Sequence, residues 1–550
     1  MAYPDLRSFI DALRDAGELH TIDAPVSPML EITEIADRVS KSPAASSSSA
    51  AAATDPHHHR AGGKALLFTH VQGAAMPLAI NVFGSYRRME MALGSEAGEG
   101  GAFADIAARI ASLAKPQPPV GIMEKMRKGL ELAKVAGMAP KTVRSGPCQQ
   151  VVHEAHAVDL MSLPIIKCWP HDGNPQAVGW RESPRDAGTT GGDGRYITFG
   201  QMYTIHPDDA DKPDGQPRPS RNIGMYRAQL IDRNHTVMHW HMHHDGARHW
   251  RAWKKSGRRM PLAIAFGGPS VLPYAATAPM PPGISELLLA GLLNGKAIDL
   301  VRCLTIDMHV PANAEIVIEG YVDTGPDAAD PAGDAPGDAL EGPFGDHTGF
   351  YSLPDRYPIF TVTAITHRHE PIYPTTIVGL PPQEDYYMGK ATERIFLPLL
   401  QTLVPDIIDY DLPMFGVFHN CAFIQIRKEY PLQARRVMHA IWGAGQMAWT
   451  KMIVVVDDDV NVHDHEQVLL HLCAHCDGGR DIEMVHGPLD ILDHAAPQLG
   501  AGTKIGFDAT RKIEGENVAG HAVRPYPPLI AMTEHIKQQV TRRWHEYGLG

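Results

Sequence analysis

Four segments near the middle of the sequence decide the fold: GRYITFGQMYTI (194–205), IGMYRAQLID (223–232), TVMHWHMHH (236–244) and PLAIAFGG (261–268). They are short apolar runs separated by polar loops with turn signals, a pattern typical of β-strands. A succession of short strands in one region favours a barrel or a sandwich. The middle of the chain is therefore predicted to be β-rich.

On both sides of this centre the pattern changes to helices that alternate with strands. Before it, helical spacing of apolar residues predicts helices near 6–13, 30–36 and 104–115, with strands at 64–71 and 77–84. Beyond residue 380, helix and strand patterns alternate again, and the chain closes with a predicted long helix from residue 528. The fold class is mixed α/β, with an N-terminal α/β domain (1–150), a β-rich domain (151–375) and a C-terminal α/β domain (376–550).

Composition and charge exclude several classes of protein. The 550 residues carry 50 Lys and Arg against 63 Asp and Glu, a net charge of −13, which disfavours nucleic acid or an anionic membrane as partner. No run approaches the roughly 18 apolar residues of an integral membrane segment, and the N-terminus resembles no signal or transit peptide. Six cysteines are too few for a secreted disulfide framework, so a reducing, cytoplasmic location is expected.

One anomaly of the composition is its 30 histidines. Three of them, His57 to His59, stand in a low-complexity insertion over residues 42–63 that is rich in Ala and Ser. Such a segment has little apolar surface to bury, so we expect a solvated, mobile insertion.

Several familiar motifs fail on spacing. GLLNGKA (291–297) has its glycines too close for a phosphate loop and lacks the Ser or Thr that holds magnesium. CAHC (473–476) has no second Cys/His pair, so it indicates a helix end instead of a zinc site. No GxSxG motif is present to provide a serine nucleophile.

The histidine-rich segment 235–250 is the first motif that carries possible chemistry. If 237–244 is a strand, its period of two places His239, His241 and His243 on one face. This face is either an imidazole-rich sheet edge or the source of a metal ligand. Glu286, which opens an apolar helix further on, is open to two interpretations as well: a ligand, or a carboxylate that stabilises the helix N-terminus.

The second motif is EGPFGDHTGF (341–350). Glu341 and Asp346 flank Gly-Pro-Phe-Gly, which must turn sharply and can point both carboxyls at one cavity. Two acids beside an arginine provide a controllable proton, because the guanidinium keeps one acid ionised while burial raises the pKa of the other. The alternative is a solvated turn with incidental acids.

These motifs, with PMPPGISE (279–286), ITHRHEPIYPTTIVG (365–379) and KMIVVVDDDVNVHD (451–464), follow the order and spacing of one family. The sequence resembles the UbiD-type decarboxylases, reversible carboxy-lyases that use prenylated flavin mononucleotide (FMN), from about residue 4 to the C-terminal helix. The resemblance implies a central split β-barrel of flavin-reductase type that holds the cofactor, and a C-terminal domain used in oligomerisation.

The resemblance also assigns residues around the cofactor. Asn222, His243 and Glu286 are implied as ligands of a divalent metal, with His241 and His244 as alternatives to His243. This donor set suits Mn²⁺ or Mg²⁺, and the metal would bridge to the cofactor phosphate. The other implied cofactor contacts come from Arg227, from the stretch 275–278 around Thr277, which would hold K⁺ through backbone carbonyls, and from Lys451, which would pair with the phosphate.

The catalytic residues implied by the resemblance are Arg227, Glu341 and Asp346. The implied reaction is the reversible, non-oxidative decarboxylation of an aromatic or α,β-unsaturated acid, with a hydroxyaryl acid favoured because Asp stands at 346. Partners would be the aromatic acid, carbon dioxide, a flavin prenyltransferase that supplies the cofactor, and further copies in a dimer or hexamer. Alternatives are a polyprenyl-4-hydroxybenzoate decarboxylase of quinone biosynthesis, a metal-dependent hydrolase, and a non-catalytic flavin-binding protein.

Overall fold

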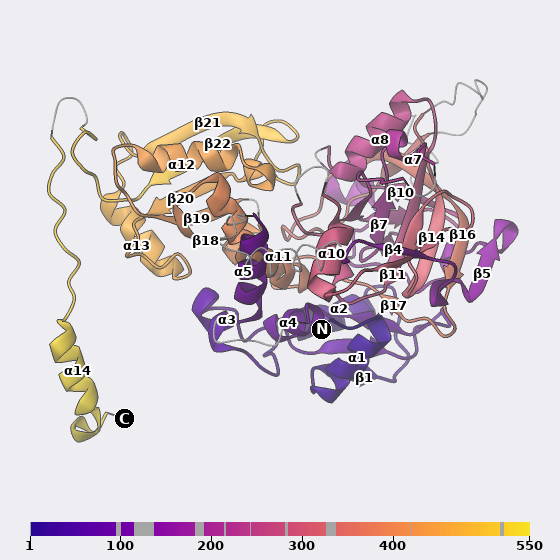
Figure 1. The fold of residues 1–550 in the computed structure, drawn as a ribbon, viewed down its shortest axis with the longest axis horizontal. Helices are drawn as coiled ribbons and strands as arrows, with labels where there is room; N and C mark the ends of the chain where they lie inside the picture. The colour runs from indigo at the N-terminus through magenta and orange to yellow at the C-terminus, as the bar shows by residue number, and fades with distance from the viewer. Residues whose placement is uncertain are drawn as a thin grey trace, which may run out of the picture.

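The computed structural model describes residues 2–94, 101–114, 137–181, 192–213, 216–242, 244–280, 284–325, 337–418, 420–517 and 522–549. Within these residues the strands form four sheets, and helices pack around them (Figure 1). The mixed α/β fold class predicted from the sequence is confirmed, and all six cysteines are free thiols. None of the described helices combines the length and apolar character needed to cross a membrane.

A curled ten-stranded sheet forms the centre of the molecule, in the order β6-β9-β10-β16-β14-β11-β7-β8, with β5 and β15 paired to β16. Its path does not close, so it is a half-barrel. The long strands β11 and β14 lie antiparallel along their length and are almost wholly buried, because their apolar residues face protein on both sides. The strands are β5 Val151–Glu154, β6 Tyr196–Ile197, β7 Gln201–Thr204, β8 Asn222–Met225, β9 Ala228–Leu230, β10 His235–Met238, β11 Met260–Gly267, β14 Ala314–Val322, β15 Asp338–Glu341 and β16 Asp355–His367.

Short helices and a small sheet surround the half-barrel. The helices are α7 Pro207–Ala210, α8 Asp245–Lys255, α9 Leu272–Ala275 and α10 Glu286–Asn294. The small sheet has the order β13-β12-β4, with β4 Lys141–Val143, β12 Asp299–Arg302 and β13 His309–Pro311. Strand β10 ends at Met238, so the predicted strand 237–244 is wrong beyond that residue, and helix α8 begins within the histidine-rich segment.

The N-terminal part is a four-stranded sheet, β1-β2-β3-β17, covered by helices. Strands β1 to β3 precede the half-barrel in the sequence and β17 follows it, so residues far apart in the chain share one sheet. Helix α1 buries Leu6, Phe9, Ile10 and Leu13, the residues whose spacing predicted it, and Asp5 caps its N-terminus. The elements are α1 Leu6–Asp15, β1 Leu19–Ile22, α2 Glu31–Ser40, α3 Ser49–Thr54, β2 Ala65–Phe68, β3 Leu78–Ile80, α4 Tyr86–Ala92, α5 Ala102–Ala114 and β17 Tyr373–Pro374.

The insertion over residues 42–63 is not the solvated segment that its composition predicts. It forms helix α3, which Ser48 caps, and it buries Ala51. Asp55 is also buried and accepts hydrogen bonds from the hydroxyls of Tyr86 and Tyr386, at 3.0 and 2.8 Å. These hydrogen bonds from two tyrosines elsewhere in the chain hold the insertion against the protein.

The C-terminal part is a five-stranded sheet in the order β18-β19-β20-β22-β21. Helix α11 leads into it and lies between this sheet and the rest of the molecule, packed on α5 (Figure 1). The elements are α11 Glu384–Leu403, β18 Ile407–Asp411, β19 Cys421–Ile426, α12 Gln433–Trp442, β20 Met452–Val456, α13 His465–His475, β21 Ile482–Pro488 and β22 Ala501–Asp508. Helix α13 ends within CAHC, as predicted.

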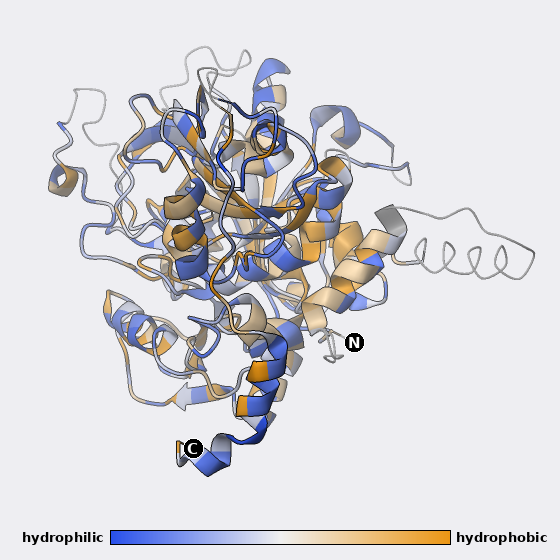
Figure 2. Ribbon diagram, turned by 90° about the vertical axis from the view of Figure 1, so that its left-hand side faces the viewer, coloured by the Kyte–Doolittle hydropathy of each residue, from blue (hydrophilic) through white to orange (hydrophobic). Residues whose placement is uncertain are grey.

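The chain ends in an arm that extends away from the C-terminal sheet (Figure 1). The predicted helix from residue 528 is shorter than expected: α14 spans Glu534–Arg542, because three prolines at 525, 527 and 528 keep the preceding residues extended. Helix α14 buries none of its residues, and Figure 2 shows apolar and polar residues side by side along it.

Candidate active site

A buried arginine joins the two acids of the 341–350 motif. Arg227 lies between β8 and β9, and its Nε and Nη2 donate to the two carboxylate oxygens of Glu341, at 2.8 and 3.0 Å. Its Nη1 donates to Asp346. The structure thus brings together the three residues predicted as catalytic, and all three are buried.

Three side chains that the sequence analysis missed hold the turn that carries the two acids. Gln229 accepts the backbone N–H of Gly342, Asp172 accepts that of Gly345, both at 2.8 Å, and Ser352 accepts that of Phe344 at 3.2 Å. The Phe344 ring also lies 4.7 Å from the Arg227 guanidinium, a stacking contact that helps fix it. No sequence pattern marks these residues, because hydrogen bonds to backbone atoms follow no periodicity.

Glycine is required at one position of this turn by the space available. A Cβ on Gly345 would lie 2.1 Å from the Trp169 ring. The Trp169 indole is itself fixed, because its Nε1 donates to the Val378 carbonyl at 2.8 Å. The motif therefore needs glycine here to bring Asp346 to the arginine.

Each acid has its own imidazole. Nδ1 of His239 lies 2.7 Å from Oε2 of Glu341, and Nδ1 of His347 lies 2.9 Å from Oδ1 of Asp346. The backbone N–H of His239 donates to the Arg227 carbonyl at 3.2 Å, so the pairing of β9 with β10 places its side chain beside the arginine. We call these five residues (Arg227, Glu341, Asp346, His239 and His347) the Arg227 cluster.

The charges of this cluster keep both acids ionised. Burial raises the pKa of Glu341, but Arg227 and His239 outweigh burial and lower it to about 2. Burial acts in the same way on Asp346, where Arg227 and His347 hold the pKa below its ordinary value. Burial lowers the pKa of His347, but Asp346 raises it to about 9. At neutral pH the mobile proton of this site is therefore on an imidazole and not on a carboxyl.

Two of the three predicted metal ligands lie together next to the half-barrel. Asn222 begins β8 and Glu286 begins α10, and the backbone N–H of Ile223 donates to Glu286 at 2.9 Å. Both side chains are buried, and burial raises the pKa of Glu286 to about 7. No lysine or arginine of the described residues pairs with Glu286. A buried carboxylate without a positive partner, beside an amide, fits a divalent cation.

The third predicted ligand, His243, lies outside the described residues. The alternatives His241 and His244 stack on each other, with ring centroids 4.5 Å apart. His239 packs edge-on against His241 at 4.9 Å, and its Nδ1 is taken by Glu341. Strand β10 ends at Met238, before His239 and His241, and the part of the predicted face at His243 lies outside the described residues.

The remaining predicted cofactor residues lie at separate places. The hydroxyl of Thr277 donates to the Tyr274 carbonyl at 2.9 Å, just after α9. Lys451 precedes β20 and pairs with Asp493 at 2.9 Å. The neighbouring His494 lies 3.1 Å from the Thr348 hydroxyl, so the loop that holds Lys451 touches the turn after Asp346.

Two cavities adjoin these residues. One is a small hollow lined by Asn222, by Arg218 and Arg221, which the sequence analysis did not single out, and by Asp307. The other is a small hollow lined by His347 and Asp385 and by apolar residues between α11 and β19, among them Met414 and Phe418. In the first, Asp307 already pairs with Arg218 at 3.3 Å, and the second has an apolar wall beside an imidazole.

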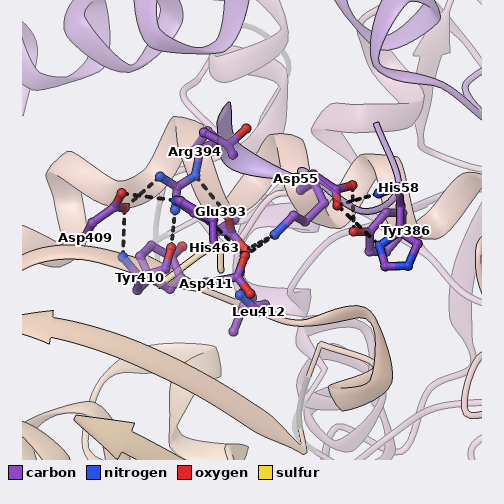
Figure 3. Close-up of polar contacts among 12 residues, drawn as sticks. Asp55, His58, Tyr386, Glu393, Arg394, Asp409, Tyr410, Asp411, Leu412 and His463 are labelled. Carbon is purple, nitrogen blue, oxygen red and sulfur yellow. Dashed lines mark hydrogen bonds and ion pairs between the residues drawn. The ribbon is translucent and has the colours of Figure 1, made fainter. Parts of the chain in front are cut away.

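A second buried cluster contains a possible metal-binding trio, Glu393, Asp411 and His463, with ligand atoms within 4.8 Å of one another. Lys390 already lies among them, and its Nζ donates to Glu393 at 2.9 Å and to Asp411. Arg394, Asp409 and His465 of α13 extend this network. A second group lies beside it, in which Asp55 of the insertion binds His58 and the Tyr386 hydroxyl (Figure 3). We call the first group the Lys390 cluster and interpret it as a structural charge network, because the Lys390 ammonium occupies the position that a metal ion would take.

The comparisons with known proteins match this fold along the whole chain. Family models for the N-terminal, Rift-related and C-terminal domains of 3-octaprenyl-4-hydroxybenzoate carboxy-lyase match residues 10–109, 141–381 and 386–509. An uncharacterized protein of Aquifex aeolicus (strain VF5) is 42% identical over 547 residues, which cover 100% of this chain and 99% of the relative. One of Archaeoglobus fulgidus is 40% identical over 548 residues, with 99% of each covered.

Two solved structures have the same fold. The vanillic acid decarboxylase of Sedimentibacter hydroxybenzoicus in its closed form has a TM-score of 0.77 at 21% identity, with 99% of both chains covered. The UbiD-class enzyme HmfF of Pelotomaculum thermopropionicum in complex with FMN has a TM-score of 0.66 at 24% identity, with 95% of this chain and 97% of that chain covered.

Fold and family models together define the class of the protein, which is a carboxy-lyase. The chain belongs to the UbiD family, whose three domain models match it in order.

Proposed function

We propose that this carboxy-lyase uses prenylated FMN to decarboxylate, reversibly and without oxidation, an aromatic or α,β-unsaturated acid, with a hydroxyaryl acid as the favoured substrate. The observation that carries the proposal is the buried arginine between two carboxylates, each paired with an imidazole. A merely flavin-binding protein has no use for such an arrangement. The UbiD-class structures that resemble this chain include complexes with FMN and with prenylated FMN, which supports this cofactor.

The residues of the chain fit a phosphate-bearing cofactor and its metal. Asn222, Glu286 and, from the family resemblance, His243 would hold Mn²⁺ or Mg²⁺, and the buried carboxylate of Glu286 needs such a positive charge. Thr277 and its neighbours would hold K⁺. Lys451 would pair with the phosphate, as a single ammonium can, once it leaves Asp493.

Prenylated FMN, when bound, supplies the electron sink that no side chain offers for the loss of carbon dioxide from an sp² carbon. The protein contributes position and protons. Arg227 would orient the substrate carboxylate, while its bidentate bond to Glu341 holds the guanidinium in place. Asp346 would then donate a proton to the carbon that loses carbon dioxide: its O–H bond breaks as the new C–H bond forms. A positioned acid contributes a rate factor of about 10² to 10⁴.

The substrate class rests on the acid at 346 and on relatives of the same fold. Vanillic acid and 3,4-dihydroxybenzoic acid decarboxylases are among the solved structures similar to this chain. In a hydroxyaryl acid, an ortho or para hydroxyl can delocalise the charge that develops when carbon dioxide leaves. We therefore propose a hydroxyaryl acid in preference to an acrylic acid.

The assembly that we propose for the enzyme follows from its C-terminal arm. Helix α14 buries no residue within its own chain, while Ile530 and Leu529 of the arm are 99% and 65% exposed. A second copy of the chain would cover this apolar surface, so we propose a dimer or a hexamer. We also propose a cytoplasmic location, with a flavin prenyltransferase as the source of the cofactor, and domains over 1–150, 151–375 and 376–550.

Co-expression with a flavin prenyltransferase tests the proposal. The purified protein is expected to show a flavin-like absorbance, to contain Mn²⁺, and to release carbon dioxide from at least one member of a panel of hydroxyaryl acids. Glu286→Gln and His243→Ala are expected to lose the metal, measured by elemental analysis. A loaded protein that is inactive on every aryl and acrylic acid would contradict the proposed reaction.

A further inference from the structure

His347 lies between the Asp346 carboxylate and a cavity. Its backbone N–H and its Nδ1 both approach Oδ1 of Asp346, at 2.7 and 2.9 Å. The ring also packs against Phe418, with centroids 5.7 Å apart, and it lines the small hollow next to α11. The imidazole therefore separates the acid from the space through which water can arrive.

A decarboxylase consumes one proton in each turnover, because the carbon that loses carbon dioxide gains a hydrogen. Asp346 is ionised in the resting site, so it must receive a proton before it can donate one. Arg227 cannot supply it, since the two carboxylates raise the pKa of this guanidinium further. Of the groups bonded to Asp346, His347 alone has a ring proton that it can release and regain near neutral pH.

We propose that His347 is a positioning residue that supplies Asp346 with the proton of each turnover, an inference that rests on the proposed decarboxylation. The Nδ1–H bond of His347 breaks as an O–H bond forms on Asp346. That O–H bond breaks in turn as the C–H bond of the product forms. The neutral imidazole keeps its Nε2–H and regains a proton at Nδ1 from the solvent, so no oxidant or reductant is needed and the site returns to its starting charge.

The charges around His347 favour its protonated form. Burial lowers its pKa, but Asp346 from the same turn, Asp385 on α11 and Asp490 after β21 raise it to about 9. Burial and neighbouring positive charges, that of His347 among them, lower the pKa of His241 well below its ordinary value. His347 therefore carries a proton at neutral pH while its histidine neighbour does not.

The other imidazole of the Arg227 cluster lacks this access. Only 7% of the His239 side chain is exposed, against 17% for His347. His239 packs between Tyr357 and His241, at ring distances of 4.4 and 4.9 Å, and it is not among the residues that line the hollow next to α11. The Nε2 atoms of both imidazoles are buried. The two imidazoles thus have the same bond to a carboxylate but different routes to water, and His239 serves as the matched control.

The test compares His347→Asn with His239→Asn in the cofactor-loaded enzyme. An asparagine amide can still donate to the carboxylate, but it cannot carry a proton. We expect kcat of the wild type to fall as the pH rises through about 9. In His347→Asn, kcat at pH 7 should fall about 10²-fold with little change in KM, the alkaline limb should vanish, and added imidazole should restore part of the rate. His239→Asn should keep the alkaline limb and gain nothing from imidazole.

A second readout does not depend on activity. The cofactor-free protein is labelled with ¹⁵N-histidine, and the His347 signal is assigned as the one that His347→Asn lacks. This signal should titrate near pH 9 in the wild type and closer to pH 6.5 in Asp346→Asn. An unaltered pH profile in His347→Asn, a change in KM alone, or a wild-type titration near 6.5 would overturn the inference. His347→Gln replaces the first variant if that one does not fold. If the wild type itself releases no carbon dioxide from any acid, the proposed function fails instead.

Discussion

The described residues include two buried clusters built on the same plan, a cation between two carboxylates with imidazoles around them, and we propose that one of them carries the chemistry. In the Lys390 cluster the ammonium binds Glu393 and Asp411, and two imidazoles, those of His463 and His465, bind one carboxylate, Asp411. In the Arg227 cluster each carboxylate binds a different imidazole, so the two acids have different surroundings.

The two clusters also differ in their location in the fold. The Lys390 cluster joins helix α11 to the C-terminal sheet, and the Asp55 group beside it joins α11 to the 42–63 insertion (Figure 3). The Arg227 cluster lies within the half-barrel and its turn, where His347 lines a cavity. We infer that the first cluster holds the parts of the molecule together and the second carries out the reaction. The predictions below test this division.

The largest expected effect is on activity. Glu341→Gln removes the charge that holds Arg227, and we expect decarboxylation by the cofactor-loaded enzyme to fall at least about 10²-fold while the cofactor stays bound. The control is the same substitution in the other cluster, Glu393→Gln, which should keep the kcat of the folded protein. Carbon dioxide release and flavin absorbance measure the two outcomes. Equal activity losses in both variants would remove the distinction between the clusters.

The next effect is on stability. Lys390→Met removes the ammonium that joins Glu393 to Asp411, while Arg394 still pairs with Glu393 at 3.0 Å. Breaking a buried pair in this way costs up to about 3–5 kcal/mol. Chemical denaturation should show this loss, with the activity per folded molecule unchanged. If the stability of Lys390→Met equals that of the wild type, the cluster does not hold the molecule together.

The free energy of unfolding at acid pH provides a further test of the Lys390 cluster. Burial raises the pKa of Asp409, but His463 and Arg394 outweigh burial and lower it to about 2. A carboxyl with a lowered pKa stabilises the fold above its unfolded pKa of about 3.9 and loses that contribution as the pH falls toward 2. Asp409→Asn should therefore flatten the loss of stability between about pH 4 and 2. An identical slope in wild type and variant would contradict the prediction.

The smallest effect concerns the insertion. Asp55→Asn weakens the hydrogen bonds from Tyr86 and Tyr386, and we expect a loss of about 1 kcal/mol for each bond. Limited proteolysis should then cut within residues 42–63 faster than in the wild type. Unchanged cutting would mean that Asp55 does not anchor the insertion.

Much of the fold could be predicted from the sequence because local periodicity determines it. The spacing of Leu6, Phe9, Ile10 and Leu13 predicts α1, and the short apolar runs predict the β-rich centre. The predicted histidine strand was wrong for the described residues beyond Met238, because alternation of side chains does not show where pairing with neighbouring strands ends. The insertion was also mispredicted, since its composition contains no sign of the tyrosines that bind Asp55.

The site could be predicted only in part, for a similar reason. The motif residues Arg227, Glu341 and Asp346 could be picked out because their order and spacing resemble those of a known family. Asp172 and Ser352, which fix the turn, could not be, because each binds a backbone N–H that no pattern specifies. The Lys390 cluster was missed altogether, since its bonds join residues on separate elements, such as Lys390 on α11 and Asp411 on β18, and no local pattern marks them.

The central claim is that the Arg227 cluster supplies protons to a reaction whose electron sink is a bound flavin. The most direct test is the release of carbon dioxide from hydroxyaryl acids in D₂O by the same preparation before and after removal of the cofactor. We predict that the loaded protein releases carbon dioxide and leaves one deuterium at the vacated carbon, and that the stripped protein does neither. Equal release by the stripped protein would contradict the account.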